Sequence, residues 1–189
     1  MPARALLIVS VLVSACSAGD SSRPAQVPLT PTHATAMRDS TRSFLEAFAA
    51  GVSAPPVGKR AREALALFYA PEVITSSDLA PDEPVLVQTL DSLVPAEEVV
   101  SEPAWIRSTR FEWGAMVITP LAPGIATYTA KYVEHVTDTT GTVTDLAGVQ
   151  HGVVRNGVNG WRFLTIQSAH PMTTHQRQAA LVARFTVAK

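Results

Sequence analysis

The feature that most constrains the fold is a set of four long runs in the C-terminal half, in which apolar and polar residues alternate. The runs cover about 108–119, 125–138, 142–155 and 161–170. Short segments rich in Gly, Pro, Asn and Asp separate them. Alternation with a period of two is typical of half-buried strands, and such separators form tight turns. The four runs therefore predict an antiparallel meander of long strands.

The turn at 138–141 predicts which residues of the second and third runs pair. A type I turn followed by a left-handed Gly141 places residue 138 opposite residue 142. One face of this strand pair then carries Ala126, Tyr128, Ala130, Tyr132 and Glu134 opposite Val154, Gly152, Gln150, Gly148 and Leu146. It is the more apolar face, and each tyrosine lies opposite a glycine, where a ring can lie flat. We expect this face to be concave and covered by helices.

The same reasoning extends the inner face to the first and last runs. The inward residues are predicted to be Phe111, Trp113, Ala115 and Val117 in the first run, and Trp161, Phe163, Thr165 and Gln167 in the last. Arg110, Glu112 and Arg162 then point outward. The register of the last run stays open, because a slip of one residue moves every side chain to the other face.

Apolar residues before the meander recur with helical spacing. The pattern predicts a helix from Met37 to Gly51 with Thr35 as N-cap, and a second helix over 60–70. A short strand is expected at 72–76, with 84–88 as a candidate for another. Asp91 or Ser92 can cap a third helix that ends before residue 103. Helices followed by a meander indicate an α+β fold.

The chain begins with a pattern typical of an exported protein. Arg4 precedes the apolar stretch 5–13, which is shorter than the roughly 20 residues needed to cross a bilayer but suits a signal peptide. The stretch ends in Val-Ser-Ala-Cys at 13–16, which resembles the lipobox of bacterial lipoproteins. The resemblance implies removal of residues 1–15 and attachment of acyl chains such as palmitate to Cys16. An ordinary cleaved signal with an incidental cysteine is the alternative.

The predicted domain organisation follows from this anchor. Residues 16–35, with three prolines and no periodicity, are expected to form a flexible tether. Residues 36–171 form the domain, and 172–189 a helical tail capped by Thr173 or Thr174, which either packs back or mediates association. The expected location is the bacterial cell envelope, on the outer membrane facing the periplasm if the host has two membranes.

The composition excludes several function classes. Hydrophobic residues make up 47% and charged residues 16%, which is typical of a globular domain rather than a disordered or coiled-coil chain. The net charge is -1, and the absence of a basic surplus argues against nucleic acid as a partner. The single cysteine excludes a disulfide framework within the chain and any cysteine-rich metal site.

The layout resembles the nuclear transport factor 2-like superfamily, and more closely its SnoaL-like branch. The matching segments are 43–48 as the first helix, 64–73 as a helix leading into a strand, and 154–163 as the hairpin with Gly-Trp-Arg. The resemblance covers 36–171 and implies a cone of helices over a strongly curved sheet, with a pocket at the wide end. The superfamily includes isomerases, dehydratases, epoxide hydrolases and polyketide cyclases, and many members that only bind small molecules.

Enzymes of this superfamily usually place an acid or base inside the cone, and here the predicted interior contains few such groups. The predicted ligand pocket consists of Trp113, Tyr128, Tyr132, Gln150, Thr165 and Gln167. Many relatives have two histidines where this chain has Thr165 and Gln167, neither of which exchanges a proton near neutral pH. Glu134 is expected to be solvated at a strand end. This departure favours a non-catalytic role.

The histidines are predicted to have different roles. His170 ends the last strand at the pocket rim and is the best candidate for proton transfer. His135, opposite Asp145 on the outer face, is expected to form a surface or interface pair, and His151 to be packed or to face a dimer partner. Their spacing does not favour a metal site, and no cofactor is predicted.

Two functional hypotheses follow. The preferred one is a membrane-anchored, non-catalytic module that binds a small apolar ligand or a protein. The alternative is an isomerase, hydrolase or cyclase that uses His170, which requires a titratable side chain beside Tyr128 or Tyr132. A homodimer through the outer sheet face, where Val133 and Val149 contribute to a half-apolar surface, is compatible with both.

Overall fold

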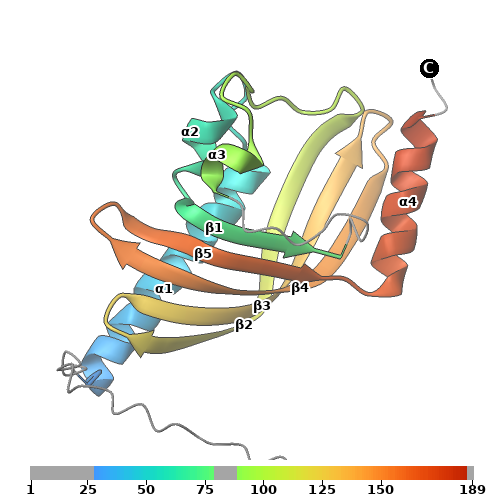
Figure 1. The fold of residues 1–189 in the computed structure, drawn as a ribbon. Coiled ribbons are helices and arrows are strands. Elements are labelled where there is room, and N and C mark those ends of the chain that lie inside the picture. Colours follow the sequence, from blue (N-terminus) through green and yellow to red (C-terminus); the bar gives the residue numbers. More distant parts are fainter. Residues whose placement is uncertain (1–27, 79–88, 187–189) are drawn as a thin grey trace, which may run out of the picture.

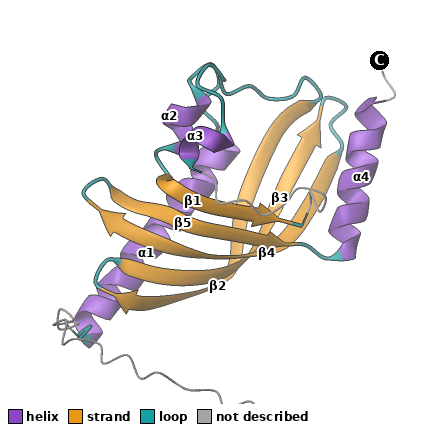
Figure 2. Cartoon of the chain, viewed as in Figure 1, coloured by secondary structure: helices purple, strands orange, loops and turns teal. Residues whose placement is uncertain are grey.

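The computed structural model describes residues 28–78 and 89–186, and shows an α+β fold in which helices flank a strongly curved five-stranded sheet (Figures 1 and 2). The strand order is β1-β5-β4-β3-β2, with β1 parallel to β5 and the remaining neighbours antiparallel. The elements are α1 (Pro31–Ser53), α2 (Ala61–Leu65), β1 (Tyr69–Ser77), α3 (Leu90–Leu93), β2 (Ile106–Ala122), β3 (Ile125–Asp138), β4 (Val143–Gly157), β5 (Gly160–Ala169) and α4 (Met172–Thr186). The predicted signal peptide, Cys16 and the candidate strand at 84–88 lie outside the described residues.

The predicted register of β3 and β4 is confirmed. The backbone N–H of Asp138 donates to the carbonyl of Thr142 at 3.0 Å, and Gly141 closes the turn with φ of 85°. A positive φ of this size is one that glycine adopts without steric cost. Tyr128 consequently pairs with Gly152, and Tyr132 with Gly148, as expected.

Both tyrosine rings lie against the backbone of β4. A Cβ atom on Gly148 would lie 2.8 Å from Cζ of Tyr132, and one on Gly152 would lie 2.7 Å from Cε1 of Tyr128 and 2.3 Å from the carbonyl oxygen of Thr165. Tyr128 is 1% exposed and Tyr132 is 6% exposed. The predicted concave face is therefore the buried face, and glycine makes room for both rings.

The prediction of which residues of β2 face inward is wrong beyond Trp113. Phe111 and Trp113 face inward as expected, but the register shifts between Trp113 and Met116. The shift is a β-bulge, whose extra residue exchanges the two faces of the strand beyond it. Met116 therefore faces inward in place of Ala115, and Val117 is 67% exposed.

The prediction for β5 is wrong beyond Phe163, because a register shift occurs there too. Trp161 and Phe163 face inward as expected, but the pairing with β4 shifts between Val153 and Val154. Beyond it Ile166 lies inside, whereas Thr165 and Gln167 point outward. The Thr165 hydroxyl accepts a hydrogen bond from the Val153 N–H at 3.0 Å, which stabilises the altered pairing.

The elements between α1 and β2 also differ from the prediction. Residues 69 and 70 belong to β1 rather than to a helix, because this segment pairs with the edge of β5. The Phe163 N–H donates to the Phe68 carbonyl at 2.8 Å. The third helix is only the short α3, with Thr89 rather than Asp91 or Ser92 as N-cap, and Pro95 follows it closely.

Helix α1 starts earlier and ends later than expected. Thr30 is its N-cap, accepting a hydrogen bond from the His33 N–H at 3.3 Å, so 31–35 belong to the helix and not to a tether. Proline is tolerated in the first turn, where its missing N–H is not needed. Gly51 does not end the helix. A Cβ there would lie 2.9 Å from the Phe68 ring, so the glycine makes room for that ring.

The C-terminal tail packs back onto the concave face, where helix α4 covers the ends of β3 and β4 (Figure 1). Leu181 is buried against Leu146, and Phe185 stacks on Trp105 with ring centroids 4.9 Å apart. Arg184 forms an ion pair at 2.9 Å with the fully buried Asp138. Among the described helices, none is both long and apolar enough to cross a membrane.

We expect Gly152→Ala to lower the free energy of unfolding by about 1–3 kcal/mol, because the added methyl group clashes with a backbone carbonyl and a buried ring. Gly157→Ala is the matched control, since nothing lies within 4 Å of a Cβ at that position in the same strand. Chemical denaturation of the two variants measures the difference. Equal stabilities would contradict the close packing of Tyr128 on β4.

Candidate acid–base site

The site lies where two neighbouring parallel strands end. Ser77, the last residue of β1, pairs with Ser168 near the end of β5. The next residue, Asp78, donates from its backbone to the Ser168 carbonyl at 3.4 Å. His170 follows β5 directly. Because parallel strands run in the same direction, their C-terminal ends bring Asp78 and His170 together.

The Asp78 carboxylate holds His170 through two hydrogen bonds. Oδ1 lies 2.5 Å from Nδ1 of the ring, and Oδ2 accepts from the backbone N–H at 2.8 Å. The His170 side chain is 2% exposed, whereas that of Asp78 is 40% exposed. Partial burial raises the pKa of Asp78, but the hydrogen bonds from the backbone and ring of His170 outweigh this and leave the pKa below its usual value.

These contacts assign the protons of the site. An ionised Asp78 can only accept, so Nδ1 of His170 carries a proton, and Nε2 is an acceptor whenever the ring is neutral. Nε2 forms a short hydrogen bond with the Tyr132 hydroxyl, which is the donor in this arrangement. Burial raises the pKa of Tyr132 to about 12, so this hydroxyl keeps its proton near neutral pH. Asp78, His170 and Tyr132 form one chain of hydrogen bonds, which we call the Asp78–His170–Tyr132 relay.

The relay continues into a buried polar network on the concave face. A hydrogen bond from Ser168 lowers the pKa of Tyr132, against the larger effect of burial. The Gln150 amide donates to the Ser168 hydroxyl at 3.4 Å and accepts at 2.7 Å from the Tyr128 hydroxyl. Buried polar groups that are hydrogen-bonded in this way hold their partners in fixed positions.

Two more titratable groups lie beside the relay. Glu134 follows Tyr132 by two residues on the same face of β3, and burial raises the pKa of its carboxyl, against a smaller opposing effect of His170. The expectation that Glu134 is solvated is therefore wrong. Nε2 of His175, in the first turn of α4, lies 3.4 Å from the Asp78 carboxylate and 3.2 Å from the His170 carbonyl.

The structure brings some of the predicted pocket residues together and separates others. Tyr132 and His170 meet in the relay, and Gln150 joins the network. Trp113 packs in the core, with its indole N–H donating to the Leu45 carbonyl at 2.7 Å. Thr165 and Gln167 lie on the opposite face of the sheet, for the reason given above.

Sequence reasoning missed Asp78. The residue follows the short strand predicted at 72–76, but the meander pattern contains no sign that this strand joins the edge of β5 in parallel. An acidic residue directly after a strand is the signal that could have suggested it. Pairing with the residue 92 positions later requires the topology of the sheet.

The other histidines lie outside this site. Nδ1 of His135 is 2.7 Å from the Asp145 carboxylate on the outer face, so the predicted surface pair forms. His151 bonds the Thr129 hydroxyl at 2.9 Å, also on the outer face. In residues 28–78 and 89–186, no group of three or more His, Cys, Asp or Glu side chains is placed to hold a metal ion.

Comparison with known proteins identifies the fold. No protein-family model matches the chain, and no curated protein is significantly similar to it in sequence. A nuclear transport factor 2-like superfamily protein from Salmonella enterica superposes with a TM-score of 0.55 at 9% identity, covering 72% of this chain and 92% of that chain. The predicted α+β cone is confirmed: the chain has the nuclear transport factor 2-like fold.

Proteins with different roles share this fold. A hexachlorocyclohexane dehydrochlorinase, LinA type 2, superposes with a TM-score of 0.53 at 10% identity, covering 72% of this chain and 86% of that chain. The association domain of Caenorhabditis elegans CaMKII gives a TM-score of 0.54 at 7% identity, covering 71% and 95%. At these identities the likeness extends to the fold alone, so function has to be argued from the residues of this chain.

The bond between Asp78 and the His170 backbone predicts a pH-dependent signal. Because the pKa of Asp78 lies below its ordinary 3.8, this bond stabilises the fold above about pH 4 and is lost as the pH falls through the lower folded pKa. The amide proton of His170 should move upfield in that range, as measured by two-dimensional NMR. In Asp78→Asn the amide shift should stay constant over the same range. A flat profile in the parent chain would contradict the contact.

Proposed function

We propose that this chain is an acid–base enzyme of the isomerase or lyase type, acting on a small molecule bound in the cone. The observation that carries the proposal is the Asp78–His170–Tyr132 relay. Its three groups are ordered as a carboxylate, an imidazole and a hydroxyl, the arrangement by which a histidine is oriented to exchange a proton with a hydroxyl group.

The relay can move a proton in either direction. The Tyr132 oxygen takes a proton from a carbon next to a substrate carbonyl while its own proton passes to Nε2 of His170. The imidazolium that forms is stabilised by the Asp78 carboxylate, and the substrate becomes an enolate. Return of the proton to a different carbon gives isomerisation, and loss of a leaving group gives elimination. Glu134, whose carboxyl has a raised pKa, is placed to donate a proton to a substrate oxygen.

Three further points support this proposal over the non-catalytic module. The non-catalytic preference depended on Thr165 and Gln167 occupying inward positions, and both residues point outward. The titratable group that the enzymatic alternative requires beside Tyr132 is His170. One neighbour with the same fold is by name a dehydrochlorinase, which is an elimination enzyme.

A non-catalytic binding module is the second candidate. It is favoured because both ring nitrogens of His170 already form hydrogen bonds within the chain, and the ring is almost fully buried. A network of this kind can also serve to hold β1, β3 and β5 together. The two candidates differ in whether Tyr132 exchanges protons with a bound molecule.

Exchange of carbon-bound protons in D₂O distinguishes the candidates. The full chain is incubated with a panel of cyclic and aryl ketones and β-hydroxy ketones, and loss of the α-proton signal is followed by proton NMR. We expect exchange or elimination above the buffer rate with at least one probe. Tyr132→Phe and His170→Gln should slow it by about 10²–10⁴-fold, the usual contribution of a positioned acid or base.

The control for this assay is His151→Gln, because His151 lies on the outer face of the sheet, hydrogen-bonded to Thr129 and away from the relay. Its rate should equal that of the parent chain. If a ketone binds saturably but its α-protons exchange no faster than in buffer, the binding module is the correct function. If Tyr132→Phe keeps the full rate, the relay is not the catalytic centre.

We also propose that the domain acts on the surface of the bacterial envelope, held by lipid on Cys16. The support is the lipobox-like sequence at 13–16 and the position of the chain's single cysteine in it. In bacteria fed an alkynyl palmitate analogue, the parent chain should incorporate the label and sediment with membranes. Cys16→Ser should lose the label and leave the membrane fraction. Equal labelling of both chains would contradict the anchor. Homodimerisation through the outer face stays a prediction for sedimentation analysis.

A further inference from the structure

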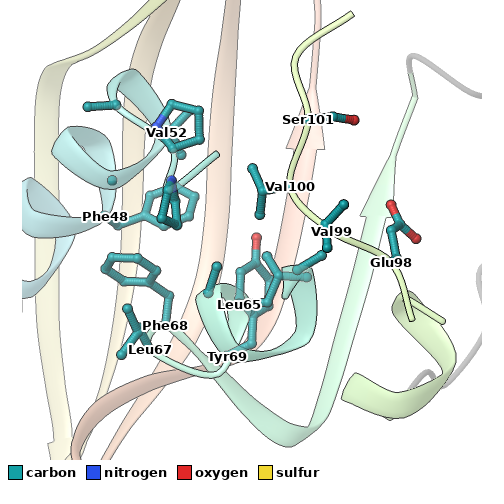
Figure 3. Close-up of a pocket in the computed structure, with 16 residues that line it drawn as sticks. Phe48, Val52, Leu65, Leu67, Phe68, Tyr69, Glu98, Val99, Val100 and Ser101 are labelled. Atoms are coloured by element: carbon teal, nitrogen blue, oxygen red, sulfur yellow. The ribbon is translucent and has the colours of Figure 1, made fainter. Parts of the chain in front are cut away.

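A cavity lies apart from the relay, between the end of α1, α2, the start of β1 and the segment 98–101 (Figure 3). Its volume is about 590 Å³, within the usual range for small-molecule sites. Its wall is mainly apolar and includes Phe48, Leu65, Phe68, Tyr69, Val99 and Val100. None of its lining residues belongs to the relay.

The outer wall of this cavity is fixed by backbone hydrogen bonds. The Val100 N–H donates to the Lys59 carbonyl at 2.8 Å, and its own carbonyl accepts from the Gly58 N–H at 2.9 Å. The Ala61 N–H donates to the Glu98 carbonyl at 2.9 Å. Segments 58–61 and 98–100 therefore form a short antiparallel pair, which holds the cavity open without a ligand.

The hydroxyl of Tyr69 is a polar group that points into this cavity. Figure 3 shows it pointing from β1 toward Val100. The ring is held between Phe163 and Phe48, with centroid distances of 5.7 and 6.4 Å. Within the described part of the chain this hydroxyl has no hydrogen-bond partner, and burial raises its pKa to about 12, so it stays protonated. A donor in an apolar cavity gains free energy when an acceptor reaches it.

We propose that this cavity is a second binding site, for a small, uncharged, largely apolar molecule that offers one hydrogen-bond acceptor, such as a carbonyl oxygen, to Tyr69. The charge of the lining fits an uncharged ligand. Among the described residues of the lining, the one ionisable side chain besides Tyr69 is the carboxylate of Glu98, so an anion would be repelled and a cation would find a single carboxylate there.

The uncharged naphthalene ketone Prodan tests the site, because its carbonyl accepts hydrogen bonds and its emission shifts to the blue when that bond is lost. The full chain should bind it saturably in a fluorescence titration. Tyr69→Phe keeps the ring but removes the donor, so it should weaken binding by about five-fold and shift the bound emission to the blue. Unchanged affinity and emission would overturn the assigned ligand class.

A matched pair of variants locates the binding. Ala64 lines the cavity, and Ala66 lies two residues away, is exposed and does not line it. Ala64→Trp should abolish saturable binding, and Ala66→Trp should leave it unchanged. If Ala64→Trp does not fold, as judged by circular dichroism, Ala54→Trp fills the cavity from another lining position. Binding that survives the filling variant, or no saturable binding in the parent chain, would overturn the site.

Discussion

The contact of two tyrosine rings with two glycines determines the position of almost everything else in the concave face. Tyr128 and Tyr132 can lie flat on β4 only because Gly152 and Gly148 lack a Cβ atom at the points of contact. With the rings flat on β4, both hydroxyls reach hydrogen-bond partners on neighbouring strands or at their ends. One meets Gln150 and the other meets His170. The packing of the core and the polar network are therefore consequences of the same register.

The second requirement is the edge pairing of β1 with β5. A meander alone has no carboxylate at the end of its last strand, so His170 would lack an orienting partner. Parallel pairing places Asp78 there, at the end of β1, a strand that lies far from β5 in the sequence. The hydrogen bonds that result keep the carboxyl ionised and fix which ring nitrogen carries the proton. The chemistry proposed for Tyr132 depends on that assignment.

Local pattern predicted the parts of the fold that local interactions determine. Alternation and the turn at Gly141 were sufficient for the register of β3 and β4, including the outward position of His135 opposite Asp145. The shift between Trp113 and Met116 in β2 and the shift in the β4–β5 pairing were not predictable, because an extra residue in a strand is settled by packing across the sheet. The shift in β5 exchanges the faces of the strand beyond it, which is why the alternation pattern assigns Thr165 and Gln167 to the pocket. Asp78 was missed because its partner is set by topology.

Tyr69 and Tyr132 show how one physical effect leads to two kinds of site. Burial raises the pKa of each to about 12, so each is a hydrogen-bond donor near neutral pH. Tyr132 has a fixed acceptor in His170, and a proton that leaves it has a base to receive it. Tyr69 has no hydrogen-bond partner on the described part of the chain, so no base there is placed to receive its proton. The first arrangement suits proton transfer, whereas the second can only bind. On this argument the relay and the Tyr69 cavity have separate roles, although both depend on tyrosines buried by the same aromatic core.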